Sequence, residues 1–278
     1  MTHSPAIWVD GEPTCSLPLP DRGLDFGDGL FETLLLRRGQ ALYESLHFER
    51  LQAGLQVLGF PDCLEQARQQ LSVASAQLAE HQWAALRLTV TRGAAPRGYA
   101  PPEEVTPRIV ISAAALSQDR SQFPDAVHLG WAELRWSSQP LLAGLKHLNR
   151  LEQVMAAREA SAQGLDDVVV LDQEGSVCSV SSANLFVVSG GTLYTPALES
   201  CGISGTRRRL VLERWAPESG LVVEQCHVAA AQLEQADELF ICNSIRGIVP
   251  VASLGGRQWH DFPVSRTLHA RYCESLPC

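Results

Sequence analysis

The chain has 278 residues, of which 45% are hydrophobic and 19% charged, and its formal net charge is −9 at pH 7. This composition is typical of a globular protein that is long enough for two domains. The acidic balance disfavours general nucleic-acid binding, because phosphate contacts are made mainly by Lys and Arg. No apolar run approaches the roughly 20 residues of a membrane-spanning helix, and the N-terminus lacks the basic and apolar regions of a secretory signal.

The first half of the chain predicts a sheet with two helices. Strands are expected at 7–9, 30–36, 84–91 and 108–113, and helices at about 48–58 and 62–80. The glycine- and aspartate-rich stretch 21–29 is expected to be a loop. A polar segment at 117–125, with a proline near its end, is typical of an interdomain linker.

The second half predicts a larger sheet with three helices. Strands are expected near 127–134, 168–171, 184–188, 192–195, 221–226, 238–242 and 248–254, and helices near 149–163, 204–215 and from 263. Strands and helices do not alternate strictly and hairpins are frequent, which favours an α+β fold over a doubly wound one. We therefore expect a smaller N-terminal domain at 1–116, a linker at 117–125 and a larger C-terminal domain at 126–278.

The eight cysteines and eight histidines have no spacing typical of a metal site. No two cysteines stand at C-x-x-C spacing and no histidines form an H-E-x-x-H pattern. We expect no metal, and free thiols in a reducing cytoplasm.

The chain has 22 Lys plus Arg, and Lys146 is its only lysine. Arg stays charged at working pH, whereas a desolvated Lys amine can lose its proton and act as a nucleophile or base. From the count alone, a leftover surface lysine is an equally good interpretation. However, the apolar residues before Lys146 and the helical pattern after it place the amine at the boundary of an element.

Three other stretches favour an anion site. Arg50 lies in an amphipathic helix, although a surface salt bridge is the commoner fate of such an arginine. Small and hydroxyl residues at 202–206 precede a helix, where free N–H groups can bind a phosphate, and they also suit an ordinary N-cap. The turn at 242–244 adds donors after an apolar strand. A lysine, an arginine and a helix-end anion site together fit pyridoxal phosphate, an aldehyde held as a Schiff base with its phosphate anchored.

Longer motifs give a resemblance that runs almost end to end. They are Phe26-Gly27-Asp28-Gly29-Leu30-Phe31-Glu32-Thr33, Arg97-Gly98-Tyr99, Ala143 to Val154, Ser182-Ala183-Asn184-Leu185-Phe186 and Ile241-Cys242-Asn243. In these motifs the chain resembles the fold-type IV family of pyridoxal-phosphate enzymes, which includes D-amino-acid and branched-chain aminotransferases and aminodeoxychorismate lyase. The segment around Lys146 and the Arg97 motif resemble the lyase branch.

The resemblance implies a D-amino-acid aminotransferase-like fold of two α+β domains, with the cofactor in the cleft between them, in a homodimer. It implies that Lys146 holds the cofactor as a Schiff base. Its other implied cofactor-binding residues are Arg50, Ser179, Ile203, Ser204, Asn243 and Ser244, and its implied substrate-binding residues are Arg97 and Asn149.

Ser179 departs from the family pattern. It stands where the family typically has a glutamate that keeps the pyridine nitrogen protonated. A hydroxyl can hydrogen-bond this nitrogen but supplies no negative charge to hold a proton there. The weaker electron sink should harm transamination more than elimination, in which the leaving group takes the electrons. An impaired enzyme or a shifted local alignment remains an alternative.

The activity that the resemblance implies is a lyase reaction from 4-amino-4-deoxychorismate to 4-aminobenzoate and pyruvate, on the route to folate and coupled to an aminodeoxychorismate synthase. Two alternatives remain open: a D-amino-acid or branched-chain aminotransferase, and a catalytically silent pyridoxal-phosphate-binding protein. Neither a nucleic acid nor a membrane is an expected partner.

Overall fold

The computed structural model describes residues 6–14, 16–96 and 98–277. The chain divides into two compact units. Unit 1 consists of Met1–Asp119 and Leu145–Asn149, and unit 2 of Arg120–Gly144 and Arg150–Cys278. The five residues that contain Lys146 therefore pack with unit 1, although the chain on both sides of them belongs to unit 2.

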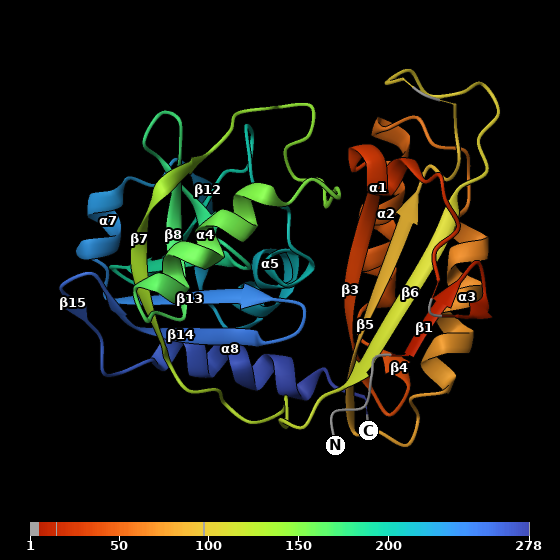
Figure 1. Cartoon of the computed structure of the whole chain (residues 1–278). Coiled ribbons are helices and arrows are strands. Elements are labelled where there is room, and N and C mark those ends of the chain that lie inside the picture. The colour runs from red at the N-terminus through yellow and green to blue at the C-terminus, as the bar shows by residue number, and fades with distance from the viewer. Residues whose placement is uncertain (1–5, 15, 97, 278) are drawn as a thin grey trace. The chain divides into compact units, whose positions relative to one another are not determined.

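Unit 1 is an antiparallel sheet with helices. Its strands are β1 (Ala6–Val9), β2 (Glu12–Pro13), β3 (Gly29–Arg37), β4 (Gln40–Ala41), β5 (Trp83–Thr91) and β6 (Arg108–Ala115), and its helices are α1 (Arg22–Phe26), α2 (Glu44–Val57) and α3 (Leu64–Ala76). The strand order is β2-β1-β6-β5-β3-β4 (Figure 1).

The core of unit 1 lies between this sheet and helices α2 and α3. Alternate residues of β3, namely Leu30, Leu34 and Leu36, point into the same apolar cluster as Phe48 and Leu51 of α2 and Leu71 of α3. Side chains alternate between the faces of a strand, so one face of β3 is committed to this core. Glu32 is an even-numbered residue like these leucines, so it lies on the same face of β3, and it is also buried.

The loop predicted at 21–29 is wrong in part, because residues Arg22–Phe26 form helix α1. The side chain of Asp21 accepts a hydrogen bond from the Gly23 N–H at 2.8 Å and so caps the helix start. The helix ends at Gly27, whose φ of +66° is a left-handed conformation that glycine adopts without strain. A helix this short depends on its caps, and the hydrophobic pattern alone does not reveal it.

Unit 2 is built around a mixed sheet. Its strands are β7 (Val127–Trp136), β8 (Asp167–Asp172), β9 (Val177–Val180), β10 (Asn184–Ser189), β11 (Thr192–Pro196), β12 (Val222–Cys226), β13 (Glu238–Asn243), β14 (Gly247–Leu254) and β15 (Arg257–Gln258). Its helices are α4 (Leu151–Ala162), α5 (Thr206–Leu210), the π-helical turn η1 (Val211–Trp215), α6 (Ala216–Glu218), α7 (Ala230–Glu234) and α8 (Pro263–Glu274).

The strand order of unit 2 is β12-β11-β10-β13-β14-β7-β8-β9, and β15 pairs with β14. Parallel pairs join β11 to β12, β14 to β7 and β7 to β8, and the remaining pairs are antiparallel. Helix α4 packs against β7 and β8, and α8 packs against β14 (Figure 1). Combining hairpins with parallel connections gives the α+β arrangement that the sequence predicts.

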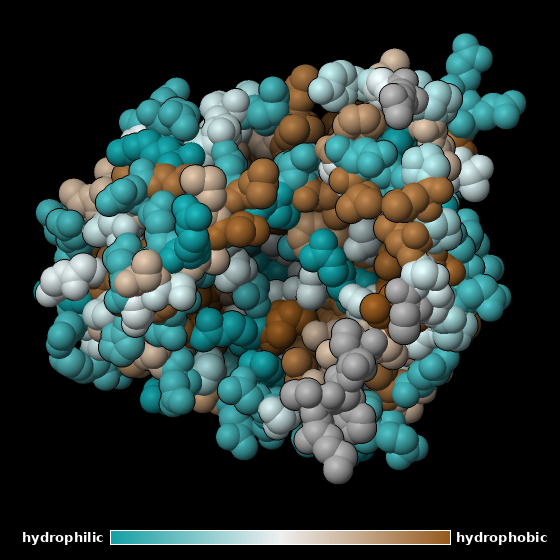
Figure 2. All heavy atoms as spheres, in the orientation of Figure 1, coloured by the Kyte–Doolittle hydropathy of each residue, from teal (hydrophilic) through white to brown (hydrophobic). Residues whose placement is uncertain are grey.

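Hydrophobic side chains gather in several groups among hydrophilic ones on the face shown in Figure 2. In unit 2, the exposed fractions of Leu151, Val154 and Met155 on α4 are 77%, 61% and 43%. Their i, i+3, i+4 spacing places them on one face of the helix. Among the described residues, none of the helices is long and apolar enough to cross a membrane.

Candidate active site

Lys146 lies on a short extended segment that pairs with the edge of β3 within unit 1. The carbonyl of Lys146 accepts a hydrogen bond from the Phe31 N–H at 2.9 Å, and the Leu148 N–H donates to the Gly29 carbonyl at 3.0 Å. These two bonds flank an antiparallel bridge between Leu30 and His147. The backbone of the only lysine is therefore fixed on both sides, which limits where its side chain can reach.

The amine of Lys146 faces an aromatic ring. Its Nζ atom lies 4.3 Å from the centroid of the Phe31 ring, and the lysine side chain is half-buried. A cation over a ring face is stabilised by the ring quadrupole. The lysine side chain is thus partly shielded from solvent.

Arg50 and His47 of α2 form a buried charged cluster with Glu32 of β3. Its Nε and Nη2 atoms donate to the two carboxylate oxygens of Glu32, the first at 2.8 Å, and His47 Nδ1 lies 2.6 Å from the same carboxylate. Burial alone would raise the pKa of Glu32, but the charge and hydrogen bonds of Arg50, together with His47, outweigh it and lower the pKa to about 2. Glu32 is therefore an anion that holds the guanidinium in place.

The partners of Lys146 and Arg50 are adjacent residues of β3. Phe31 contacts the lysine and Glu32 the arginine, and successive side chains of a strand point to opposite faces. Strand β3 pairs with β4 only through Leu36 and Arg37. The stretch near Phe31 therefore lies beside the Lys146 segment and not beside β4.

In unit 2, the loop that carries Ile203 and Ser204 is held by hydrogen bonds to Gly144 and Asn184. The Ser204 N–H donates to the Gly144 carbonyl, and the Gly144 N–H donates to the Gly202 carbonyl, both at 3.0 Å. The side-chain amide of Asn184 donates to the Ile203 carbonyl at 2.9 Å. The loop is thus bonded to Gly144, the residue directly before Leu145, where the Lys146 segment begins.

Gly205 is the N-cap of α5 and provides no capping side chain. A Cβ atom at this position would lie 2.0 Å from Asn184 Oδ1, so the close approach of these two segments of the chain requires glycine. The first N–H groups of a helix lack partners within the helix. This helix start is therefore able to donate to an anion.

The turn that carries Asn243 and Ser244 is held against the same helix. The Asn243 side-chain oxygen accepts from the N–H groups of Ile245 and Arg246 at 3.0 and 2.7 Å. Arg207, which is fully buried on α5, donates to the Ser244 carbonyl at 3.2 Å. Within unit 2, the structure therefore brings the 202–206 loop and the 243–246 turn together.

Ser179 is buried on β9, where its hydroxyl oxygen accepts a hydrogen bond from Trp136 Nε1 at 3.0 Å. Trp136 is the last residue of β7 and is also buried. Strands β7 and β9 flank β8, and the hydrogen bond between the two side chains fixes the orientation of the serine hydroxyl.

Of the two predicted substrate-binding residues, the structure describes only Asn149. Asn149 is exposed, and its amide donates to the Gly27 carbonyl at 3.3 Å, so it lies beside the end of α1. Arg97 lies outside the described residues. The loop after it is held by Arg22, whose Nη1 and Nη2 atoms donate to the carbonyls of Gly98 and Tyr99 at 2.8 and 2.7 Å.

Several residues of the site were not predicted from the sequence. They are Arg22, Glu32, Trp136, Asn184 and Arg207, which hold other residues of the site in place. Glu32 gave one signal, since an acidic residue among the apolar residues of a buried strand requires a partner. Asn184 stands in a motif quoted above, but neither it nor the other three residues reveals its partner in the sequence, because the partners are distant in the chain.

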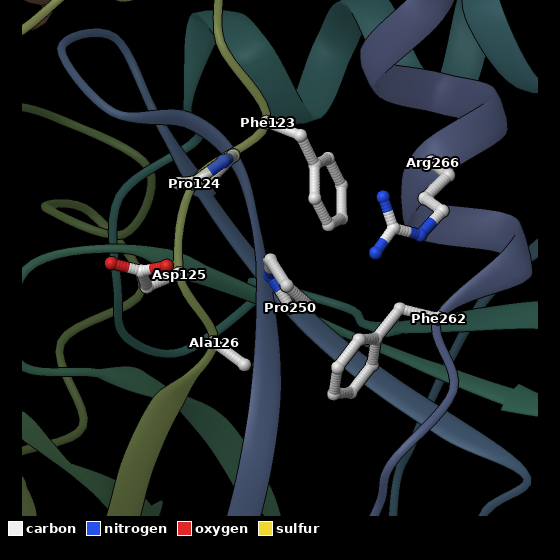
Figure 3. A pocket seen from close by; sticks show the side chains of 7 residues that line it. All are labelled: Phe123, Pro124, Asp125, Ala126, Pro250, Phe262 and Arg266. Atoms are coloured by element: carbon white, nitrogen blue, oxygen red, sulfur yellow. The ribbon is translucent and has the colours of Figure 1, made fainter.

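A cavity of about 300 Å³ lies elsewhere in unit 2. In Figure 3 the rings of Phe123 and Phe262 face it together with Pro250 and the guanidinium of Arg266. That guanidinium lies 4.3 Å from the centroid of the Phe123 ring. None of the predicted site residues lines this cavity. Within the described ranges, no group of three or more His, Cys, Asp and Glu side chains is arranged to hold a metal ion.

The chain belongs to the class IV aminotransferase family, whose match covers residues 29–254. This membership confirms the predicted α+β fold of the fold-type IV class. The chain is 34% identical over 264 residues to an aminodeoxychorismate lyase of Vibrio harveyi, covering 94% of this chain and 96% of that protein. It is 26% identical to a D-alanine aminotransferase of Bacillus licheniformis, covering 87% of this chain and 84% of the relative.

A solved structure agrees with these similarities. The 4-amino-4-deoxychorismate lyase of Pseudomonas aeruginosa superimposes with a TM-score of 0.90 and 40% sequence identity, covering 97% of this chain and 99% of that one. The similarity therefore extends over both units of the fold.

Proposed function

We propose that this protein is a pyridoxal-phosphate-dependent lyase that converts 4-amino-4-deoxychorismate into 4-aminobenzoate and pyruvate. The single observation that carries the proposal is Lys146, the only lysine of the chain, held by backbone pairing at the edge of β3. The choice of reaction is supported by near full-length similarity to lyases at 34% and 40% identity, against 26% to an aminotransferase.

Each unit separately offers residues with chemistry that the cofactor requires. Lys146 provides an amine for the aldehyde, and the helix start at Gly205 with the turn at Ser244 provides donors for the phosphate. We assign phosphate binding to Ile203, Ser204 and Ser244 in unit 2, beside Asn243, which shapes the turn. We also assign it to Arg50 in unit 1, whose guanidinium Glu32 orients.

When bound, pyridoxal phosphate supplies an aldehyde for the substrate's amino group and a ring that draws electrons from the reacting bonds. The Lys146 amine is the base that removes the proton from the substrate carbon that carries the amino group. Enolpyruvate departs as the substrate ring becomes aromatic, and it then takes up a proton to become pyruvate. Because aromatisation is favourable, the protein has to supply orientation and proton transfer.

Ser179 is proposed to meet the ring nitrogen of the cofactor. Trp136 donates to the serine oxygen, which leaves the serine O–H proton to donate elsewhere. A donor at this position favours a neutral ring nitrogen. Arg97 is proposed to bind a substrate carboxylate, which suits the bidentate geometry of a guanidinium, and Asn149 to line the substrate site.

The experiment that tests the proposal supplies the purified protein with 4-amino-4-deoxychorismate, made by a chorismate-aminating enzyme, and measures 4-aminobenzoate and pyruvate. Equal amounts of the two products are expected. An aminotransferase, the alternative supported by the 26% identical relative, would instead exchange amino groups between amino acids and 2-oxo acids. A silent binding protein, suggested by Ser179, would give the absorbance of the bound cofactor and neither activity.

The proposal extends to a homodimer in the cytoplasm that works with an aminodeoxychorismate synthase on the route to folate. A dimer is supported by the exposed apolar face of Leu151, Val154 and Met155 on α4. A reducing compartment is supported by the cysteines of the described residues, which are free thiols. Sedimentation analysis tests the dimer, and a monomer at micromolar concentration would contradict it.

A further inference from the structure

Two buried cysteines of unit 2 lie in contact with each other. Cys178 is on β9 and Cys201 is in the loop before α5, and their Sγ atoms are 3.1 Å apart. The side chains are exposed by only 4% and 7%. Both are free thiols that share one hydrogen bond, and both belong to an apolar cluster that also contains Trp136.

The separation of the two sulfur atoms is close to that of a disulfide. A disulfide needs an S–S distance of about 2.05 Å, so the sulfur atoms would have to approach by about 1 Å. Cys178 Sγ also lies against Gly202, where an added Cβ atom would be 2.8 Å from it. A shift of this sulfur atom would therefore act directly on the backbone of the 202–206 loop.

We propose that Cys178 and Cys201 form a redox-active dithiol, which a peroxide converts into a disulfide, and that this modification weakens cofactor binding by unit 2. The disulfide chemistry is independent of the proposed function, whereas the effect on the cofactor rests on it.

The reaction balances with one hydrogen peroxide. The Cys201 sulfur attacks a peroxide oxygen, the O–O bond breaks, and one water molecule and a sulfenic acid form. The Cys178 sulfur then attacks the Cys201 sulfur, the S–O bond breaks, and a second water molecule leaves. The two thiols lose two electrons and two protons in total, and the peroxide is reduced to two water molecules.

The environment favours Cys201 as the first nucleophile. The hydrogen bond with Cys178 lowers the pKa of the Cys201 thiol, and the same interaction together with burial raises the pKa of the Cys178 thiol. By contrast, burial raises the pKa of Cys242 to about 12 and, together with the nearby Asp62 charge, that of Cys63 to about 11. Reaction at the pair should therefore precede reaction at these two other buried cysteines.

The pair is placed to affect residues proposed to bind the cofactor. Cys178 directly precedes Ser179 on β9, so a movement of Cys178 also moves the backbone of Ser179. Cys201 is two residues before Ile203, and the intervening Gly202 has a φ of +85°. A disulfide would pull on both segments, and Gly202 lies in contact with the Cys178 sulfur and the Leu198 side chain, which leaves it little space to move.

The first experiment tests the chemistry alone. The holoenzyme is treated with hydrogen peroxide, the free thiols are alkylated, and the protein is digested with trypsin, which leaves both cysteines on one peptide, 159–207. We expect this peptide to be about 2 Da lighter and protected from alkylation. Cleavage after Glu199 should leave its two parts joined until a reductant is added. Alkylation of both cysteines under conditions that oxidise Cys63 or Cys242 would overturn the proposal.

The second experiment measures the affinity of the reduced and oxidised proteins for pyridoxal phosphate by its absorbance. Oxidation should weaken binding about fivefold or more, and a thiol reductant should restore it. C178A and C201A should each bind the cofactor equally well before and after peroxide. C63A retains the pair and should lose affinity on oxidation as the wild-type protein does. If the disulfide forms and affinity is unchanged, the proposed effect on the cofactor is wrong. If the reduced protein does not bind the cofactor, the proposed function fails.

Discussion

Trp136 and Ser179 form a buried hydrogen bond in which the indole Nε1 donates to the serine oxygen at 3.0 Å. An indole nitrogen is only a donor, so the serine acts as the acceptor and its own proton remains available. A hydroxyl oriented in this way is suited to donate to a neutral ring nitrogen. No carboxylate is present at this position to hold a proton there.

The substitution Ser179→Glu is expected to favour amino-group exchange over elimination. A carboxylate would accept the indole proton and would also stabilise a protonated ring nitrogen, which makes the ring a stronger electron sink. We expect transamination of D-alanine or a branched-chain amino acid to increase about tenfold, equivalent to about 1.4 kcal/mol of barrier. Parallel assays of 2-oxo acid amination and 4-aminobenzoate formation measure the change.

Ser179→Gln is the matched control, because it has the size of the glutamate without its charge. It should not increase amino-group exchange. If glutamine and glutamate produce the same gain, the charge is not its cause and the proposed role of Ser179 is wrong.

The sequence predicted most of the strands and long helices because their patterns are local. The even-numbered leucines of β3 indicate the buried face of that strand, and the helical spacing of Phe48, Leu51 and Leu55 indicates the buried face of α2. Helix α1 was missed because five residues are too few for a periodic pattern, and its stability depends on the Asp21 cap. The pairing of the Lys146 segment with β3 was not predicted, since it joins residues more than 100 positions apart.

The candidate site was predicted only as far as its motifs extend. The sequence predicts Lys146 as a site residue by its uniqueness and Ser204 and Ser244 by their motifs, but it does not predict the residues that hold them. Arg207 stands in a run of three arginines, which suggests a solvated helix face, yet the structure buries it beside the Ser244 carbonyl. An arginine's surroundings are set by distant parts of the chain, so its neighbours in the sequence do not reveal burial.

Glu32→Gln is expected to destabilise the protein in a pH-dependent manner. The pKa of Glu32 is lowered from 4.5 to about 2, so its contribution to stability is present above about pH 4.5 and is lost as the pH falls towards 2. A shift of this size corresponds to about 3 kcal/mol at pH 7, to order of magnitude. Urea unfolding at pH 7 and at about pH 3.5 should show the difference between the two proteins narrowing at the lower pH.

Glu44→Gln is the control for this measurement, because Glu44 pairs with Arg68 in an exposed ion pair that should be worth about 0.5 kcal/mol. A Glu32→Gln variant that loses no more stability than this control would contradict the assigned role of the buried cluster.

Lys146→Ala is expected to abolish turnover, with a loss of at least about a thousandfold, because no other lysine can replace its amine. Borohydride reduction of the native protein with pyridoxal phosphate should fix the cofactor on the tryptic peptide 136–150, which contains Lys146. The alanine variant should show no labelled peptide and should keep its far-UV circular dichroism. Normal turnover by this variant would refute the assigned chemistry.

Arg22→Lys is expected to weaken substrate binding more than it slows the chemical step. Arg22 is buried, and its planar guanidinium spans the Gly98 and Tyr99 carbonyls while its Nε donates to Asp28 at 2.8 Å. A lysine ammonium keeps the charge but cannot span these three acceptors in one plane. The loop that follows Arg97 should then lose its fixed position, and the proposed contact of Arg97 with a substrate carboxylate should weaken.

We expect KM for 4-amino-4-deoxychorismate to rise about tenfold, equivalent to about 1.4 kcal/mol, with a smaller change in kcat. Limited proteolysis should cut the variant faster within 94–107. Arg68→Lys, at an exposed arginine of unit 1, should change neither constant. If kcat falls about tenfold and KM does not change, Arg22 does not act through the loop. A loop that positions the substrate less well should raise KM.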